Sequence, residues 1–290
     1  MRHFLWDIET VPRPEAELLA LMPPPAVMPE DIKNPPEADL SKCPVYGGDE
    51  AKQDAWKQKK LADHAVATEA ARSTWEERQI EAKQKFIDDA ALSAVTGSVK
   101  LIGIRDYEAK VTHILVAGAS KEQLDKIGRA TYPSIVSFHW MASERDALHC
   151  FAANVNSGAV TPRNLDHQSA FKLIGFYTHG FDLPFIFRRC WIMGAAVPWS
   201  LRMGRYFNDS VSLDLQELWK LGDNQVKTGG MDELAKVLGT KRKAGSGERF
   251  YALWESDPVG AILYLLGDLD ATEEMAVKMG CVYVPMKGEK

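Results

Sequence analysis

The stretch Phe4-Leu5-Trp6-Asp7-Ile8-Glu9-Thr10 decides how this 290-residue chain folds, because it reads as a buried strand that carries two acids. Side chains two residues apart on a strand point to the same face, so Asp7 and Glu9 project together while Leu5 and Ile8 help to anchor the strand. Two carboxylates at the end of a buried strand destabilise it unless positive charge neutralises them. A divalent cation is the usual source of that charge.

A second Asp-x-Glu pair, Asp106-Tyr107-Glu108, shows how little the spacing means by itself. About one such pair is expected by chance at ordinary composition. This one lies between two strand-like runs, residues 101–104 and 111–116, where a polar turn belongs. We interpret it as the solvated tip of a hairpin. The first pair therefore needs partners elsewhere in the chain to form a site.

Composition sets broad limits on the protein. The chain is 46% hydrophobic with a formal charge of −5, and we expect a single domain over residues 1–290 with an insertion at about residues 13–92. No apolar run approaches the roughly 18 residues that cross a bilayer, and no signal-peptide core is present, so we expect a soluble, cytoplasmic protein. The cysteines never form a C-x-x-C pair, which favours reduced thiols.

The insertion combines two kinds of sequence. Prolines make most of residues 12–36 unfit for regular structure, apart from a short helix at 16–21. Residues 50–92 are rich in Ala, Lys, Gln and Glu and contain no Pro or Gly, which predicts one or two helices. Their apolar stripe is narrow, as in a solvated arm that packs by one edge. The alternative is an arm that grips substrate or a partner protein.

The rest of the chain alternates strands and helices, which predicts an α/β layer architecture with a mixed sheet. Strands at 98–105 and 110–117 would form an antiparallel meander with the opening strand. Further strands are expected at 171–177 and 211–215, and helices at 144–155, 218–221, 231–238 and 258–279.

Two later segments supply partners for the first acids. Asp182 follows Phe181 at a strand-to-helix junction, where it could also be only a helix cap. Tyr264 and Asp268 are four residues apart on the closing helix, so they share one face. Taken singly, Tyr264 could be a buried aromatic and Asp268 a solvated acid. Asp270 points well around that helix and is the weaker candidate.

Together these segments resemble a known enzyme superfamily. Asp7-Ile8-Glu9-Thr10, Phe181-Asp182-Leu183-Pro184-Phe185 and Tyr264-x-x-x-Asp268-x-x-Ala271-Thr272 occur in the order of its three motifs. The chain resembles the DEDD superfamily of 3′→5′ exonucleases, which have the ribonuclease-H-like fold, in its tyrosine-containing (DEDDy) branch. More narrowly, it is similar to stand-alone exonucleases, many encoded by phages, that are related to the proofreading domain of family-B DNA polymerases.

The resemblance covers most of the chain and has departures. Residues 91–99 and 230–239 also resemble family segments, whereas residues 13–90 match only loosely. Gly175-Phe176-Tyr177 stands where the family commonly has Gly-His-Asn, which puts its grip on substrate in doubt. Leu263 excludes the branch that uses a histidine base.

The resemblance implies a two-metal hydrolysis of phosphodiester bonds. Two Mg²⁺ or Mn²⁺ ions about 3.5–4 Å apart activate a water and stabilise the leaving oxygen, and carboxylates suit such ions. By resemblance, Asp7 bridges both ions, Glu9 and Asp268 complete the site of the water-activating ion, and Asp182 positions the second. Tyr264 orients the water, since its reference pKa near 10 makes it a poor base.

The resemblance and the basic residues suggest weaker substrate contacts. Thr10 could touch the terminal nucleotide, and Phe181 could wedge against its base, although Phe181, Phe185 and Trp6 also suit a core. A phosphate path could use several basic residues, each of which is at least as well explained as solvated surface: Arg188, Arg189, Arg202, Arg205, Lys241, Arg242 and Lys243. We expect His139, His167 and His179 to be structural.

The function expected from these observations is removal of nucleotides from the 3′ end of single-stranded or frayed DNA, within a bacterial or phage-infected cell. The alternatives are a 3′→5′ exoribonuclease of the same fold and a catalytically silent nucleic-acid-binding scaffold. The chain has no room for a polymerase domain, so proofreading would act in trans. A replication, repair or recombination protein could bind through the helical insertion.

Overall fold

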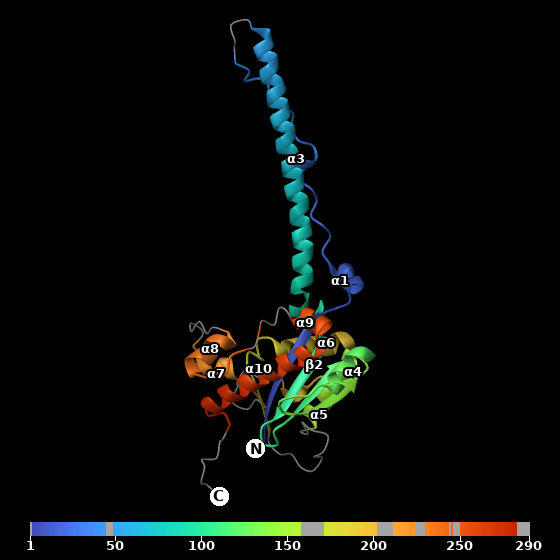
Figure 1. Cartoon of the computed structure of the whole chain (residues 1–290), viewed down its shortest axis with the longest axis vertical. Helices are drawn as coiled ribbons and strands as arrows, with labels where there is room; N and C mark the ends of the chain where they lie inside the picture. The colour runs from blue at the N-terminus through green and yellow to red at the C-terminus, as the bar shows by residue number, and fades with distance from the viewer. Residues whose placement is uncertain are drawn as a thin grey trace. The chain divides into compact units, whose positions relative to one another are not determined.

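The fold is described by a computed structural model that covers residues 2–44, 49–157, 171–201, 211–223, 230–243, 245 and 250–282. The chain divides into two compact units. One consists of Met1–Leu18 and Asp89–Lys290, and the other is Leu19–Asp88. The second unit thus falls inside the segment that the sequence marks as an insertion (Figure 1).

The first unit is built on a six-stranded mixed sheet of order β4-β3-β2-β1-β5-β6. Its strands are β1 (Arg2–Pro12), β2 (Gly97–Asp106), β3 (Val111–Ala117), β4 (Ile135–Met141), β5 (Phe171–Gly175) and β6 (Ser212–Asp214). The first three form the expected antiparallel meander, while β4 runs parallel to β3, β5 to β1 and β6 to β5. The predicted α/β fold with a mixed sheet is confirmed, and the arrangement is consistent with the ribonuclease-H-like fold.

Helices cover both faces of this sheet (Figure 1). On one face α10 (Pro258–Lys278) packs on β1 and β2 together with α4 (Lys121–Arg129), α8 (Met231–Leu238) and α9 (Phe250–Ser256). On the other face lie α5 (Glu144–Asn156) and α6 (Asp182–Met193). The short helix α7 (Leu215–Lys220) follows β6 directly.

The side chains of β1 alternate between these two faces. Those on the α5 and α6 side belong to one buried cluster: Phe4, Trp6 and Ile8. Leu5 and Val11 belong to the other cluster, beneath α10. Because the strand repeats every two residues, Asp7 and Glu9 share the face of Leu5 and Val11. The strand therefore presents both acids toward α10.

A glycine lets α10 approach the sheet closely at this point. Gly103 on β2 pairs with Asp7 across the ladder. A Cβ atom on Gly103 would lie only 3.0–3.1 Å from the side chain of Leu265, so any other residue there would push the helix outward. Leu265 sits between Tyr264 and Asp268, and its contact with Gly103 sets how near those two residues come to β1.

The second unit contains α2 (Glu30–Lys33), α3 (Glu50–Asp88) and the last three residues of α1 (Glu15–Leu21). The sequence allowed one or two helices over 50–92, and α3 is a single continuous helix (Figure 1). It has no fully buried residue, in keeping with its narrow apolar stripe. The amide of Ala26 donates to Gln79 Oε1 at 3.3 Å, which ties the proline-rich segment to this helix.

One sequence expectation about the meander is wrong. Residues 107–110 do form the predicted turn, but Asp106 is only 1% exposed rather than solvated. Its carboxylate is ion-paired with Arg2 and accepts the amide of Ala109, while Glu108 accepts the amide of His3 at 3.1 Å. The turn folds back onto the start of β1, which the local sequence does not reveal.

Two further findings concern the chain as a whole. All four cysteines are free thiols, as expected: Cys43, Cys150, Cys190 and Cys281. In the part of the chain that the structure describes, no helix is both long enough and apolar enough to span a membrane.

A buried ion pair joins α6 to α5 and β2. Arg189 Nε and Nη2 donate to the two carboxylate oxygens of Glu144 at 2.8 and 2.5 Å, and its Nη1 donates to the carbonyl of Ala94 at 3.0 Å. Glu144 also accepts the amide of Val99 at 2.7 Å. The arginine side chain is 1% exposed, so every donor that it buries has a partner nearby.

We expect Arg189→Leu to lower the free energy of unfolding by about 3–5 kcal/mol, because it leaves the Glu144 carboxylate buried without its cation. The matched control is Arg188→Leu at the exposed neighbouring position, which should change stability by less than about 0.5 kcal/mol. Urea denaturation of both variants measures the difference. Equal stabilities would contradict the structural role of Arg189.

Candidate metal centre

Three carboxylates from two elements converge beside the sheet. Asp7 and Glu9 come from β1 and Asp268 comes from α10, and each offers an oxygen within 4.8 Å of the others. Glu9 and Asp268 are 6% and 1% exposed, and Asp7 is half-buried. Among the described residues this is the single group of acids, histidines or cysteines at metal-ligand spacing.

Asp182 lies next to this trio. Its Oδ1 accepts the amide of Ile8 at 3.2 Å. The pairing of β1 with β5 ends at Leu5 and Ile174, so the amides on this edge of β1 have no ladder partner beyond that point and Asp182 takes one of them. It is not a helix cap, because Phe181 holds the cap position of α6 and makes no side-chain cap bond. The capping alternative is therefore excluded.

Tyr264 brings a buried hydroxyl to the same place. The residue is 7% exposed and its ring lies 6.1 Å from that of Phe250. Neither its hydroxyl nor Asp268 Oδ1 makes a hydrogen bond of ordinary geometry within the described residues, although the two side chains are neighbours. Buried polar atoms without partners are rare in native proteins and often mark the place of a water or an ion.

The neighbouring acids on α10 are used differently. Asp270 and Glu273 are ion-paired with Arg105 at 2.5 and 3.3 Å. Glu274 accepts the amide of Lys241 at 2.7 Å. These acids fasten α10 to β2 and to the segment after α8 that contains Lys241, so the structure separates them from Asp268 as the helical spacing indicated.

Lys243 reaches into the acid cluster. Its Nζ lies 2.7 Å from Asp268 Oδ2 and 5.0 Å from the centre of the Tyr264 ring. Its backbone amide donates to Asp232 at 2.8 Å, which holds the loop in place. The sequence suggested only that this lysine might belong to a phosphate path, because nothing in the spacing of a loop residue predicts which carboxylate it meets.

The electrostatics of the cluster favour added positive charge. Burial, together with the charge on Asp268, raises the pKa of Asp7 to about 7. Burial also raises the pKa of Glu9, Asp182 and Asp268, and the charge on Asp7 adds to the shift at Glu9 and Asp182. Burial alone would lower the pKa of Lys243, but the carboxylates outweigh it and the net pKa is raised. One lysine is thus too little to keep all of these acids ionised.

The structure gives the weaker substrate candidates different positions. Thr10 is 8% exposed and its hydroxyl donates to the carbonyl of Ala91 at 2.8 Å, so that hydroxyl is already engaged. Arg189 lies inside the protein in the ion pair with Glu144, which corrects its assignment to a phosphate path. Phe181 is half-buried, with its ring 5.4 Å from that of Phe185.

The remaining candidates fall into three groups. Trp6 and Phe185 are buried core residues, as expected. Arg188 is exposed, and Arg242 is exposed in the loop beside Lys243. Arg202, Arg205 and His167 lie outside the described residues.

His139 and His179 are hydrogen-bonded to protein side chains, in keeping with the structural role expected for them. His179 Nδ1 lies 2.6 Å from Glu217 Oε2, and its Nε2 lies 3.3 Å from Ser212 Oγ. His139 Nε2 lies 3.1 Å from His113 Nδ1 on the neighbouring strand.

A buried acid that the sequence reasoning missed, Asp214, shapes the loop before Asp182. It accepts the amides of Tyr177 and His179 at 3.0 and 2.8 Å, and it also caps α7. Tyr177 has φ of 60°, a left-handed conformation that is uncommon for a residue other than glycine. Its ring lies over Gly180, where a Cβ atom would come within 2.2 Å of it. The segment Gly175-Phe176-Tyr177 thus leads into a tight turn that is held by Asp214.

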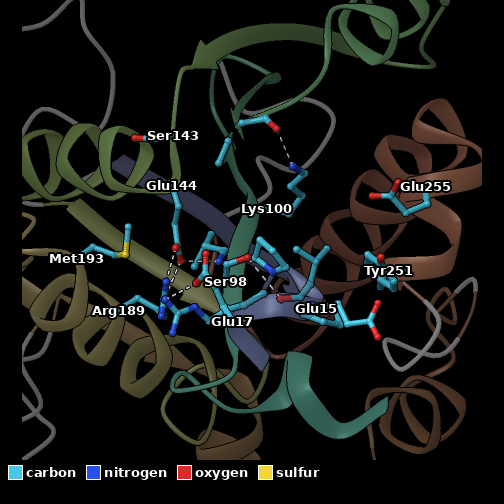
Figure 2. A pocket seen from close by; sticks show the side chains of 17 residues that line it. Glu15, Glu17, Ser98, Lys100, Ser143, Glu144, Arg189, Met193, Tyr251 and Glu255 are labelled. Atoms are coloured by element: carbon cyan, nitrogen blue, oxygen red, sulfur yellow. Dashed lines mark hydrogen bonds and ion pairs between the residues drawn. The ribbon is translucent and has the colours of Figure 1, made fainter. Parts of the chain in front are cut away.

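A separate pocket of about 550 Å³ lies where β1 ends and β2 begins, bordered by α5 and α9 (Figure 2). It contains none of the four acids. Its basic side chains are already engaged, Arg13 with Glu17 at 2.6 Å, Arg189 with Glu144, and Lys100 with the carbonyl of Gly118 at 3.0 Å. The pocket therefore offers little free positive charge to a phosphate, and the acid cluster is the better candidate site.

We expect the metal-free protein to lose stability as the pH rises from about 4 to about 7. Asp7 has a folded-state pKa of about 7 against an unfolded value near 3.9, so the folded state binds more protons in that window. Its contribution is complete below the lower value and lost on passing the higher one, on the order of a few kcal/mol.

Urea denaturation at a series of pH values in EDTA measures this slope. Asp7→Asn should make the dependence of stability on pH shallower. Asp39→Asn, at an exposed acid of the second unit, should leave that dependence unchanged. The expectation fails if wild type and Asp7→Asn show the same dependence.

Comparisons with known proteins give a limited result. No family model matches the chain, and no curated protein is similar to it. Among solved structures, the family B DNA polymerase from the hyperthermophilic archaeon Pyrobaculum calidifontis is 14% identical over 66% of this chain, with a TM-score of 0.45. The match spans 23% of that polymerase. The chain is thus distantly similar to part of a DNA polymerase, at a level that bears on neither activity nor substrate.

Proposed function

We propose that the chain is a metal-dependent 3′→5′ exonuclease that hydrolyses the phosphodiester bond at the 3′ end of single-stranded or frayed DNA. The observation that supports this most is the convergence of Asp7, Glu9 and Asp268, with Asp182 beside them and the Tyr264 hydroxyl at the same place. These residues come from three segments far apart in the sequence, and a structural role alone does not require buried acids to be gathered in this way.

The residues present fit hard divalent cations. All the donors are carboxylate oxygens, which Mg²⁺ and Mn²⁺ prefer, and no cysteine or histidine of the described ranges joins the group. Asp7, Glu9 and Asp268 would hold one ion, and Asp7 with Asp182 would lie beside a second. Bound ions of this kind acidify a water and neutralise charge on the phosphate.

The chain's own residues would then position the reactants. Burial raises the pKa of Tyr264 above its usual value, so its phenol stays protonated at neutral pH and donates a hydrogen bond to the attacking water instead of removing its proton. Lys243 also stays protonated and keeps positive charge beside the phosphate. The water oxygen bonds to phosphorus while the bond to the 3′ oxygen of the preceding nucleotide breaks. The products are a nucleoside 5′-monophosphate and a strand shortened by one nucleotide.

A 5′-labelled single-stranded DNA, incubated with the protein and Mg²⁺ or Mn²⁺, should give a ladder of products shortened from the 3′ end. EDTA should abolish the ladder because it removes the divalent ions, and Asp7→Ala should abolish it because it removes a carboxylate that would hold them. Glu108→Ala is the matched control, since it alters the other Asp-x-Glu pair, and it should retain activity.

The same assay on an RNA of equal sequence separates the alternatives. Degradation of RNA alone would replace the proposal with an exoribonuclease. Binding of DNA without degradation of either strand would favour a silent scaffold.

Tyr264→Phe should lower kcat by about 10²-fold and leave KM nearly unchanged, because it removes the group that orients the water and nothing that holds the strand. Within the part of the chain that the structure describes, the hydroxyl makes no hydrogen bond of ordinary geometry, although it neighbours Asp268, so the unfolding temperature of the variant should stay close to that of the wild type. Tyr251→Phe, at an exposed tyrosine of α9, is the control. Full activity of Tyr264→Phe would remove this residue from the mechanism.

A further inference from the structure

Three aromatic side chains form an exposed surface on and beside α6, which we call the aromatic platform: Phe187, Trp191 and Trp199. Trp191 and Trp199 are 60% and 56% exposed. Phe187 lies between them, with its ring 6.3 Å from Trp191 and 5.8 Å from Trp199, both edge-to-face. Two large indole rings are thus exposed to solvent, and both contact the ring of Phe187.

The backbone beneath the aromatic platform is firmly anchored. Trp191 follows Cys190, which is fully buried on the inner face of α6. Trp199 begins a short 3₁₀ turn (η2, Trp199–Leu201) whose last residue is fully buried. The amide and hydroxyl of Ser200 both donate to Asn156 Oδ1 at 3.2 Å. Rings held in this way bind a flat ligand with little loss of conformational freedom.

The charges around the aromatic platform are positive. Arg188 is exposed on α6 between two platform residues. Arg145 is exposed on α5, and its Nη2 donates to the carbonyl of Gly194 just past the end of α6 at 3.4 Å. Neither arginine is ion-paired with an acid in the described part of the chain. An anionic ligand would supply the missing counter-charge.

Helix α6 carries both Asp182 of the acid site and Trp191 of the aromatic platform. That helix begins at Asp182, so at about 1.5 Å per residue Trp191 lies roughly 13 Å along its axis. A strand whose 3′ end occupies the acid site would carry its preceding nucleotides over this distance. Single-stranded nucleic acid offers both π faces and phosphates, whereas an apolar protein surface would leave both arginines without an anionic partner.

We propose that the aromatic platform stacks the bases that precede the 3′ end of a single strand, with Arg188 and Arg145 on its phosphates. The direction in which the strand lies rests on the proposed function. The binding itself does not depend on catalysis and can be measured without metal.

The test measures binding to the full chain in EDTA, with oligothymidylates of roughly three and roughly twelve nucleotides. The longer strand should quench tryptophan emission and bind roughly 10- to 100-fold more weakly to Trp191→Ala and to Trp199→Ala, since each stacked base contributes about 1–3 kcal/mol. The short strand should bind the wild type and both variants with similar affinity. Trp140→Ala is the control, because that residue is 43% exposed on β4, an edge strand of the sheet that carries no platform residue.

Two further variants test the aromatic and the phosphate contacts separately. Trp191→Phe keeps an aromatic face and should retain most of the affinity. Arg188→Ala should lower the slope of log affinity against log salt by about 0.7, the value for one lost phosphate contact on a single strand. Both positions are exposed, and thermal unfolding confirms that the variants fold.

The outcomes distinguish this inference from the proposed function. Two results would contradict base stacking on the platform, even if the DNA ladder is present. One is that the tryptophan variants bind the longer strand as tightly as the wild type, and the other is that this strand does not quench the tryptophan emission of the wild type. If the variants lose affinity but the wild type degrades no strand, base stacking on the platform is supported and the exonuclease function is contradicted. A platform that docks a protein would give the first of these results.

Discussion

Like charge confined in a small buried volume is the constraint on which this structure depends. Asp7, Glu9 and Asp268 meet within 4.8 Å, and their mutual repulsion adds to the penalty of burial. An ammonium group from Lys243 beside Asp268 offsets part of that penalty, and the amide of Ile8 donates to the neighbouring Asp182. The carboxyl pKa values remain raised, and within the described residues Asp268 Oδ1 and the Tyr264 hydroxyl lack a hydrogen bond of ordinary geometry. A cation is the simplest way to complete such a site.

The topology explains why the acids meet on β1. Asp268 comes from α10 on one face of the sheet, and Asp182 from α6, which packs on the other. They can approach the same residues only where the β5 pairing has ended and one edge of β1 is free. Gly103 completes the arrangement, because its missing side chain lets Leu265 and the whole of α10 settle on the sheet.

Much of the fold could be predicted because its signals are local. The meander and the helices at 144–155 and 231–238 follow from the alternation and periodicity of apolar residues. We did not predict α4, β4 or α9. All three are short elements. In addition, β4 carries Ile135 and Trp140 exposed on a sheet edge, so it lacks the alternation of a half-buried strand.

The sequence by itself determined which residue types could form the site, since the spacing of Asp7 with Glu9 and of Tyr264 with Asp268 puts each pair on one face of its element. Only the tertiary structure decided which charges meet. Arg188 and Arg189 are neighbours in the chain, yet one is exposed and the other is buried against Glu144. Asp106 is buried with Arg2, and Lys243 lies against Asp268. Such pairings join residues far apart in the chain, and no local period encodes them.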